Sequence, residues 1–432
     1  MKLSDMSITQ LDCIDALRLS GSLTKAQLAH HTGLSLSRAS HIARELVSNG
    51  FVQDLGPTLQ TRGRKASLLQ IRPEVAYAVG IDLGSEFVRV VLVDFAGSTT
   101  SRHEESMPFH GDPAAVIDGV ASKASEMMRT QHMTRQEVVG VGVAATGIID
   151  PASGTCLTMP VLAKSWTNIP VVEGIRSKLR IERVFLEDSP RAMAISEMAF
   201  GAARGLNDFV LVNIGHSMGS GIVVNGKVLR GTGGIAGELG HIRIADPITR
   251  MEQSSVCCCG NIGCLESVAS GWAMKKQAAD AVQQGVNSSL SSTKGNDAKI
   301  TIQRIIEAAQ HDDKYACNLI SGAGRVIGIA ISFLINLLGP QRVIVGGGLA
   351  QGAGDLLLNP IIDSARSQAL PWIRSGIDIR LSELDSYSAA IGSALIAFER
   401  WIGELRKNAR KRYLNQGSDH VAFSSRPDVE LT

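Results

Sequence analysis

Four cysteines stand within eight residues in the segment CCCGNIGCLE, past the middle of the chain. Glycines beside them permit a tight turn, and the segment GELGH supplies a histidine upstream. Three thiolates and one imidazole make a closed tetrahedral shell for Zn²⁺, which leaves no open position for catalysis. The sequence therefore predicts one structural zinc ion per chain, held by His241, Cys257, Cys259 and Cys264.

The remaining cysteine of this cluster, Cys258, is expected to point away from the metal, because alternate residues of an extended turn face opposite sides. The chain contains seven cysteines, and a disulfide framework would spread them rather than gather four together. The alternative to zinc is a set of reduced structural thiols. Clustering between glycines favours the metal.

A second group of side chains suited to recognition lies near the N-terminus. Residues 35–49 have the apolar spacing of an amphipathic helix that begins at a capping serine. The other face carries short or hydrogen-bonding side chains, which can reach base edges in the major groove of DNA. These residues are Ser37, Arg38, Ser40, His41 and Arg44. The alternative is a solvated helix of an ordinary three-helix domain.

A basic segment follows, TRGRKASL, with Arg62, Arg64 and Lys65 around Gly63. A glycine-containing basic loop can enter a narrow minor groove, where negative potential is concentrated. The alternative is a plain flexible linker. The helix and the loop together predict binding to double-stranded DNA.

The elements that position these side chains divide into a head and a body. Three capped helices and two short strands are expected over residues 1–75, as three helices and a wing. This segment holds nine Lys or Arg and six Asp or Glu, whereas the whole chain has a net charge of only +2. The excess positive charge thus lies in the head, where a phosphate-binding surface needs it.

The body has the pattern of an α/β protein with two related lobes. A glycine-turned hairpin is expected from Ala76, and a similar unit recurs from Asp208. A chain of 432 residues is too long for one ordinary domain. With the resemblance described below, the expected divisions are a first lobe over 76–200, completed by a C-terminal helix over 386–412, a second lobe over 201–385 with the zinc loop, and a disordered tail over 416–432.

The chain also resembles the ROK family of repressors, open reading frames and kinases, and within it the repressors of the Mlc and NagC type. The resemblance rests on GELGH and CCCGNIGCLE, which are similar to the family's ExGH and CxCGxxGCxE signatures. GIDLG, VGVAATGIID, AISEMAFGAARG and VIVGGGLA follow the expected order. It implies a winged helix-turn-helix on a two-lobed actin-like ATPase fold, a sugar cleft between the lobes, and homo-oligomers.

The resemblance also implies the effector-binding residues. Family members that bind sugars use an Asn-Asp pair, the Glu and His of ExGH, and the Glu of the last signature. These fall on Glu187, Asp188, Glu238, His241 and Glu266. Glu187 stands where Asn is usual, so it loses an amide donor and adds a charge. In the family's kinases, the residue matching Asp188 is the base that takes the proton from the attacking hydroxyl.

The phosphate-binding loops depart from the kinase pattern. The first reads Asp-Leu-Gly-Ser-Glu over 82–86 where kinases of the family read DxGGT, and Glu86 would repel phosphate. The second reads GHSMGSG instead of GTGxGxG, with His216 and Ser217 in place of residues that let backbone amides approach phosphate. The sequence therefore predicts a kinase fold without kinase chemistry and no catalytic residues.

These features predict a cytoplasmic repressor of carbohydrate uptake or metabolism genes, controlled by a sugar or sugar phosphate bound between the lobes. A homodimer or homotetramer would read an inverted-repeat operator. No membrane insertion is expected, because the sequence shows neither a long apolar run nor an N-terminal signal core. Two alternatives stay open: an active ATP-dependent sugar kinase with a DNA-binding head, and a repressor controlled by a regulatory protein partner.

Overall fold

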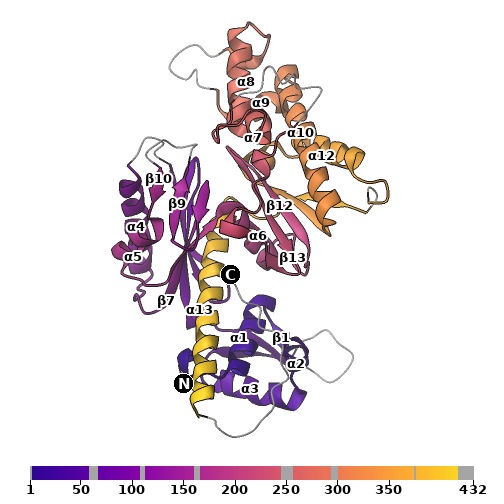
Figure 1. Cartoon of the computed structure of the whole chain (residues 1–432). Coiled ribbons are helices and arrows are strands. Elements are labelled where there is room, and N and C mark those ends of the chain that lie inside the picture. The colour runs from indigo at the N-terminus through magenta and orange to yellow at the C-terminus, as the bar shows by residue number, and fades with distance from the viewer. Residues whose placement is uncertain are drawn as a thin grey trace. The chain divides into compact units, whose positions relative to one another are not determined.

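Two units make up the chain in the computed structural model, which describes residues 2–57, 67–107, 112–159, 166–244, 256–292, 300–373 and 376–416. The body is Ala76–Phe398. The head combines Met1–Val75 with Glu399–Thr432. Figure 1 shows the elements of each unit.

Three helices dominate the first part of the head, as the apolar spacing predicts. They are α1 (Ile8–Ser20), α2 (Lys25–Thr32) and α3 (Leu36–Ser48). The residue before each helix, Ser7, Thr24 or Ser35, uses its hydroxyl to accept a hydrogen bond from the backbone N–H three residues later. These caps satisfy N–H groups that have no partner inside the helix. The helices bury one another's apolar faces, including Leu11, Leu28, Ile42 and Leu46.

A small antiparallel sheet completes this part of the head in the order β1-β3-β2. Its strands are β1 (Leu23–Thr24), β2 (Val52–Pro57) and β3 (Ser67–Ile71). The basic side chains Arg62, Arg64 and Lys65 lie outside the described residues.

The long C-terminal helix α13 (Ser388–Gln416) differs from its expected assignment. The sequence predicts that a helix over 386–412 completes the first lobe, whereas from Glu399 onward α13 groups with the head. Arg406 pairs with Asp12 and Asp15 of α1, both at 3.0 Å. Arg412 donates a hydrogen bond to the backbone oxygen of Met6 at 2.9 Å. The same half of the helix buries the apolar side chains of Ile402, Leu405 and Ala409. Residues 417–432 lie outside the described part of the chain.

Two five-stranded sheets form the body, and they share one strand arrangement. The first has the order β11-β7-β4-β5-β6 and the second the order β14-β13-β12-β15-β16. Read from right to left, the second order corresponds to the first strand by strand. In each, a leading strand pairs antiparallel with the next strand and parallel with a later one. This confirms the internal repeat predicted from the two glycine-turned hairpins.

The strands of the first sheet are β4 (Tyr77–Leu83), β5 (Phe87–Asp94), β6 (Thr99–Ser106), β7 (Val138–Ala145) and β11 (Val184–Asp188). Helices α4 (Pro113–Thr130) and α5 (Val171–Leu179) lie together beside this sheet (Figure 1). A small sheet adds β8 (Ile148–Asp150), β9 (Thr155–Thr158) and β10 (Thr167–Ile169). The first half of α13 packs closely on the first sheet, because Gly80 and Gly142 leave no side chain where the backbone of α13 passes.

The strands of the second sheet are β12 (Phe209–Ile214), β13 (Met218–Val224), β14 (Lys227–Val228), β15 (Arg342–Gly346) and β16 (Asp378–Leu381). The helices of this half of the body are α6 (Ser189–Phe200), α7 (Leu265–Ala269), α8 (Gly271–Gln283), α9 (Ile302–Gln310), α10 (Lys314–Leu338), α11 (Gly348–Ala353) and α12 (Asp355–Gln368). By length and composition α10 could cross a membrane, but 56% of its apolar window is buried inside the protein. It belongs to the apolar core of the second lobe.

Candidate functional site

The four predicted zinc ligands come together in the second lobe. The ligand atoms of His241, Cys257, Cys259 and Cys264 all lie within 4.8 Å of one another. Nδ1 of His241 is 3.5 Å from Sγ of Cys257, and the sulfurs of Cys259 and Cys264 are 3.7 Å apart. Two thiolates bound tetrahedrally to one Zn²⁺ would stand about 3.8 Å apart. The donor set and its spacing therefore fit a closed zinc site.

The local backbone brings these ligands together through a tight turn. The backbone N–H of Cys257 donates to the oxygen of Asn261 at 2.8 Å, and that of Gly260 donates to the oxygen of Cys257 at 2.9 Å. Gly260 and Gly263 have φ angles of 88° and 80°, which side chains disfavour. Cys264 then precedes the first residue of α7, which carries Glu266 in its first turn.

Cys258 lies outside the group of four ligands but is not without a partner. Its thiol donates to Oε1 of Glu266 at 3.2 Å. The other oxygen of this buried carboxylate accepts a hydrogen bond from the backbone N–H of Met218 at 3.0 Å. Alternation along the turn did not indicate this contact, because the acceptor stands on the next helix. The contact ties the cysteine turn to one of the predicted effector residues.

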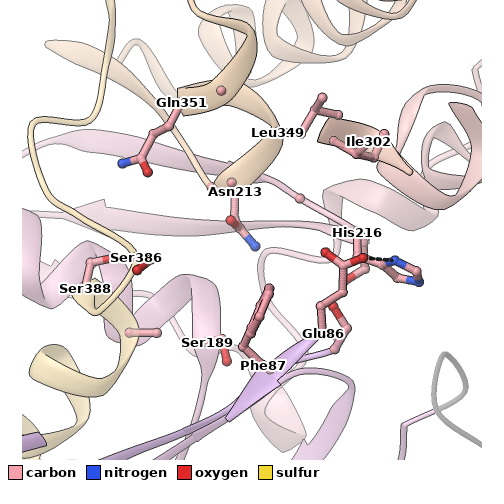
Figure 2. A pocket seen from close by; sticks show the side chains of 18 of the residues that line it. Glu86, Phe87, Ser189, Asn213, His216, Ile302, Leu349, Gln351, Ser386 and Ser388 are labelled. Atoms are coloured by element: carbon pink, nitrogen blue, oxygen red, sulfur yellow. Dashed lines mark hydrogen bonds and ion pairs between the residues drawn. The ribbon is translucent and has the colours of Figure 1, made fainter. Parts of the chain in front are cut away.

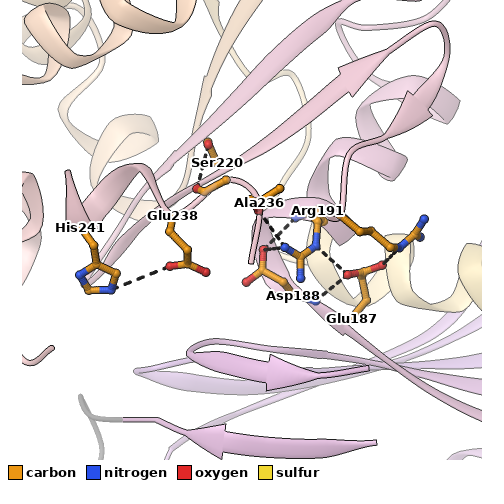
Figure 3. Close-up of polar contacts among 9 residues, drawn as sticks. Glu187, Asp188, Arg191, Ser220, Ala236, Glu238 and His241 are labelled. Atoms are coloured by element: carbon orange, nitrogen blue, oxygen red, sulfur yellow. Dashed lines mark hydrogen bonds and ion pairs between the residues drawn. The ribbon is translucent and has the colours of Figure 1, made fainter. Parts of the chain in front are cut away.

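His241 presents its two ring nitrogens to different groups. Nδ1 faces Cys257, whereas Nε2 lies 3.9 Å from Oε2 of Glu238 (Figure 3). Glu238 is the residue before the short 3₁₀ helix Leu239–His241, so the ExGH spacing places both side chains on one turn. This orientation leaves Nε2 on the side of the acidic residues when Nδ1 binds a metal.

Glu187 and Asp188 end strand β11, and Asp188 caps α6. Glu187 is buried and accepts two charge-assisted hydrogen bonds of 2.7 Å, one from Nε of Arg191 and one from Nε of Arg230. Nη1 of Arg191 donates to the backbone oxygen of Ala236 at 2.9 Å (Figure 3). The charge that replaces the family's asparagine is therefore balanced within the protein.

Asp188 is also buried but has no such close ionic partner. Its nearest recorded cationic atom is Nη1 of Arg191, 4.0 Å from Oδ2. Burial raises the pKa of Asp188 to about 7; Arg191 opposes the rise, whereas Glu238 and Glu187 add to it. At neutral pH this carboxyl can therefore both hold and accept a proton.

A cavity of about 400 Å³ is lined by residues of both loops that the sequence pattern assigns to phosphate binding, among them Glu86 and His216 (Figure 2). Both sheets and α9 contribute to its lining. Among the lining residues are Asp82, Phe87, Ser189, Asn213, Ile302 and Leu349. Asp82 is buried and accepts a hydrogen bond from Ser189 at 3.1 Å. Its burial raises its pKa to about 6.

The two departures from the kinase loops meet at the edge of this cavity. Oε1 of Glu86 is 3.2 Å from Nδ1 of His216 (Figure 2) and 3.2 Å from Nζ of Lys275. Nζ of Lys275 is also 3.0 Å from Nδ1 of His216. The hydrogen bond with His216 and the charge of Lys275 outweigh burial and lower the pKa of Glu86 to about 2. Glu86 is therefore ionised and paired with Lys275 at this edge of the cavity.

The exposed face of α3 agrees with its sequence pattern at four of five positions. Ser37, Arg38, His41 and Arg44 are exposed, and Ser40 is half-buried. Arg44 donates from Nε to the backbone oxygen of Ser40 at 3.3 Å. Nε2 of His41 lies 3.2 Å from Glu45 on the same helix. The face is polar and accessible.

Comparison with known proteins accounts for this architecture. The profile of the ROK family matches residues 78–400, about three quarters of the chain. The chain belongs to the ROK family. Its body is the ROK sugar-kinase fold, an α/β arrangement, as the resemblance implied.

The relatives of this ROK protein include both repressors and kinases. The xylose repressor of Caldicellulosiruptor bescii is 28% identical over 370 residues, which cover 86% of this chain and 90% of the relative. A ROK transcriptional regulator homologous to Escherichia coli Mlc has 28% identity and a TM-score of 0.74, covering 94% of this chain and 99% of that one. A Streptomyces griseus glucokinase bound to glucose and AMPPNP has 28% identity and a TM-score of 0.63, covering 75% of this chain and all of the kinase.

Sequence reasoning missed three cations of this ROK protein: Arg191, Arg230 and Lys275. A signal for Arg191 existed, since it is a lone charge in the otherwise apolar stretch SPRAMAIS. A charge in a buried helix needs a partner. For Arg230 and Lys275, the neighbouring sequence does not indicate which residues these two side chains contact.

Proposed function

We propose that this ROK protein is a transcriptional repressor of carbohydrate uptake or metabolism genes, and that a sugar effector sets its affinity for an operator. The head carries the proposal. The family match begins at residue 78, and the Mlc homologue covers 94% of this chain whereas the glucokinase covers 75%. The chain thus combines a sugar-kinase body with a further segment whose elements suit DNA.

The head would act as a winged helix-turn-helix. Helix α3 is the recognition helix in this proposal, because its exposed face offers Ser37, Arg38, Ser40, His41 and Arg44 to base edges. The basic segment with Arg62, Arg64 and Lys65 would contact the minor groove or phosphates. A homodimer or homotetramer would present two heads to an inverted repeat.

The effector would bind at Asp188, Glu238, His241 and Glu266, with Glu187 as a fifth candidate. Carboxylates and imidazole supply the paired acceptors and donors that sugar hydroxyls require. These groups influence one another in the structure, since Glu238 helps raise the pKa of Asp188 and Glu266 helps raise that of Glu238. Both oxygens of Glu187 are already used by arginines, so its contribution would be indirect.

One structural zinc ion per chain would occupy the site of His241, Cys257, Cys259 and Cys264. Zn²⁺ would neutralise the thiolates and close the turn. It would also hold His241 through Nδ1, which leaves Nε2 facing Glu238. The same turn positions Glu266 through Cys258. The zinc ligands, Glu238 and Glu266 would therefore form one rigid group in the second lobe, whereas Asp188 ends β11 of the first sheet.

Sugar-kinase activity is the second candidate, and Asp188 together with the cavity beside it favours that reading. In the kinases of the family the corresponding aspartate is the catalytic base, and Asp188 is poised near pH 7. Against it stands Glu86, which is ionised at the cavity edge where phosphates would bind and already pairs with Lys275, the cation that could otherwise meet a phosphate. We therefore favour a regulator without catalysis. A repressor controlled by a protein partner is the remaining alternative.

The test is to select operator DNA from a random library with the full-length protein, then to measure its release by a panel of sugars. The proposal predicts an inverted-repeat sequence bound specifically and released by a member of the panel. Specific binding that no sugar changes would favour a protein partner. Absence of any specific sequence would refute the repressor function.

A further inference from the structure

Two arginines beside the candidate effector residues have no role in the function proposed above. Arg191 lies in the first turn of α6, and Arg230 follows β14. Each donates from Nε to a different oxygen of Glu187, at 2.7 Å in both cases. Two guanidinium charges therefore share one carboxylate, and this trio keeps one positive charge in excess.

The guanidinium of Arg191 is incompletely hydrogen-bonded. Nη1 donates to the oxygen of Ala236, but Nη2 is buried and has no hydrogen-bond partner among the described residues. The side chain is only 1% exposed, so bulk water does not solvate it. A buried charged donor without an acceptor is destabilising, and native proteins rarely keep one without a reason. An acceptor supplied by a ligand would complete this group.

Arg191 stands among the residues assigned to the effector. Its Nη1 is 4.0 Å from Oδ2 of Asp188. Its charge also reaches Glu238, where burial raises the pKa and His241 and Arg191 oppose that rise. Figure 3 shows the guanidinium of Arg191 close to Asp188, Glu187 and Ala236, with Glu238 and His241 further along the same site.

We propose that the effector is a sugar that carries a carboxylate, and that Arg191, supported by Arg230, recognises this group. The proposal rests on the repressor function given above and names the chemical class of its effector. A carboxylate brings one negative charge and two coplanar oxygens, which match the excess charge of the trio and the planar fork of a guanidinium.

Neutral sugars and sugar phosphates fit this position less well. A neutral hydroxyl can accept a hydrogen bond from Nη2 but leaves the excess positive charge unbalanced. A phosphate monoester carries roughly two negative charges at neutral pH, which is one more than the excess positive charge of the trio, and Asp188 lies 4.0 Å from Nη1 of the same guanidinium. The second charge would therefore be repelled.

The experiment compares sugars that differ only in the group at one carbon. Full-length, zinc-loaded protein is mixed with glucose, glucuronate or glucose 6-phosphate, and in a second series with galactose or galacturonate. The readouts are the melting temperature and the Kd for the selected operator. We expect an acidic member to raise the melting temperature and weaken operator binding at concentrations roughly tenfold or more below its neutral partner.

Substitutions then test whether the preference for the acidic sugar depends on the guanidinium of Arg191. Arg191→Lys keeps a charge but removes the fork, so the preference for the acidic sugar should fall by roughly tenfold. Arg230→Gln, at a half-exposed position, should lower the preference less and serves if Arg191→Lys yields too little folded protein. Arg176→Ala is the matched control, since Arg176 is an exposed arginine that pairs with Glu173 on α5. It should keep the preference.

The outcomes separate this inference from the function on which it rests. Operator release by neutral sugars at equal or lower concentrations would overturn the carboxylate assignment and leave the repressor function standing. Release chiefly by glucose 6-phosphate would overturn it in the same way. A preference for glucuronate or galacturonate that persists in both Arg191→Lys and Arg230→Gln would remove Arg191 and Arg230 from the site. Operator binding that responds to none of the sugars would count against sugar control itself.

Discussion

Glu187 and Asp188 are consecutive residues at the end of β11, yet their ionisation differs. Both are buried. Burial acts to raise the pKa of Glu187, but Arg230 and Arg191 outweigh it and lower the pKa. Asp188 has one arginine at a longer distance, so burial prevails and its pKa rises to about 7. At the residue scale, the partner rather than the residue type decides which carboxyl is charged.

Asp188 should make the stability of the protein depend on pH. Unfolded, it ionises near 3.8, whereas in the folded protein it keeps its proton up to about pH 7. Its contribution is therefore fully present below pH 3.8 and is lost as pH rises to 7. Asp188→Asn cannot ionise and can still cap α6. At pH 8 it should be more stable than the wild type by at most about 4 kcal/mol, with little difference at pH 4.

Urea unfolding at pH 4, 6 and 8 measures this difference. Asp363→Asn, at an exposed position on α12, is the control and should leave the pH dependence of the unfolding free energy unchanged. An Asp188→Asn protein with the same pH dependence as the wild type would show that this carboxyl is ionised in the folded state.

The cysteine turn permits a matched pair of single-atom substitutions. Cys259→Ser replaces one of the four clustered ligands, so the purified protein should lose its zinc and part of its stability. Cys258→Ser lies next to it but outside the cluster and should retain a full equivalent of zinc. Elemental analysis of both proteins, purified without added metal, measures the zinc content. Equal zinc in the two variants would contradict the assigned ligand set.

At the element scale, helix α3 and the contact of Glu86 with His216 and Lys275 differ in how the sequence specifies them. Helix α3 buries Ala39, Ile42, Ala43 and Leu46. Because these apolar residues recur at helical spacing, the polar residues between them lie together on the opposite, exposed face. The contact of Glu86, His216 and Lys275 instead joins the turn after β4, the turn after β12 and helix α8. The first element is specified locally, and the second only by the packing of distant segments.

Arg38→Ala should relax the base preference of the protein at one operator position. Arg38 is exposed in the first turn of α3, where recognition helices contact bases. Loss of such a contact costs about 1–3 kcal/mol of binding. Binding measured on the selected operator and on single-base variants gives the cost at each position. Arg72→Ala, which removes an arginine paired with Glu74 after β3, is the control. An unchanged base preference for Arg38→Ala would exclude α3 as the reading element.

The charged contact at the cavity edge should prevent ATP binding in the wild type. With ATP and a panel of hexoses, we expect no turnover above background and no rise in melting temperature. Glu86→Gln removes the negative charge but keeps the shape, and frees Lys275 to meet a phosphate. Weak stabilisation by ATP should then appear. Sustained turnover by the wild type that vanishes in Asp188→Asn would instead establish a kinase.

At the scale of the whole molecule, the chain joins a sugar-kinase body to a head, and α13 contributes residues to both. A ligand of the body can change operator affinity only if it binds two states of the protein with different affinity. A coupling of about 1–3 kcal/mol is sufficient for a working switch. The zinc turn and Glu266 lie in the body, so their effect on DNA must act through such a coupling.

Glu266→Gln should reduce this coupling. The amide keeps the size of the carboxylate and an acceptor for the N–H of Met218, but loses the charge offered to the effector. The ratio of operator affinities without and with the releasing sugar should fall toward one, while zinc content measured in parallel stays full. Titrations of labelled operator give this ratio. An unchanged ratio together with unchanged sugar affinity would place the ligand elsewhere.

The sequence by itself determined the features that depend on neighbours along the chain. Capping residues and apolar spacing located the three head helices. Two signatures indicated four candidate metal ligands, three of them within one turn, and repeated glycine-turned hairpins indicated two related lobes. Spacing of this kind is read directly from residue types, because helix caps, turns and metal loops are closed by residues a few positions apart.

Only the tertiary structure decided the contacts between distant residues. Arg230 reaches Glu187 across 43 positions of sequence and Lys275 reaches Glu86 across 189. Arg406 of α13 contacts Asp12 of the head across 394 positions. A sequence shows that each of these charges exists but not which partner burial will bring to it. The partner is determined by how whole helices and strands pack. Burying a charge costs free energy, and an opposite charge brought close by the packing offsets that cost.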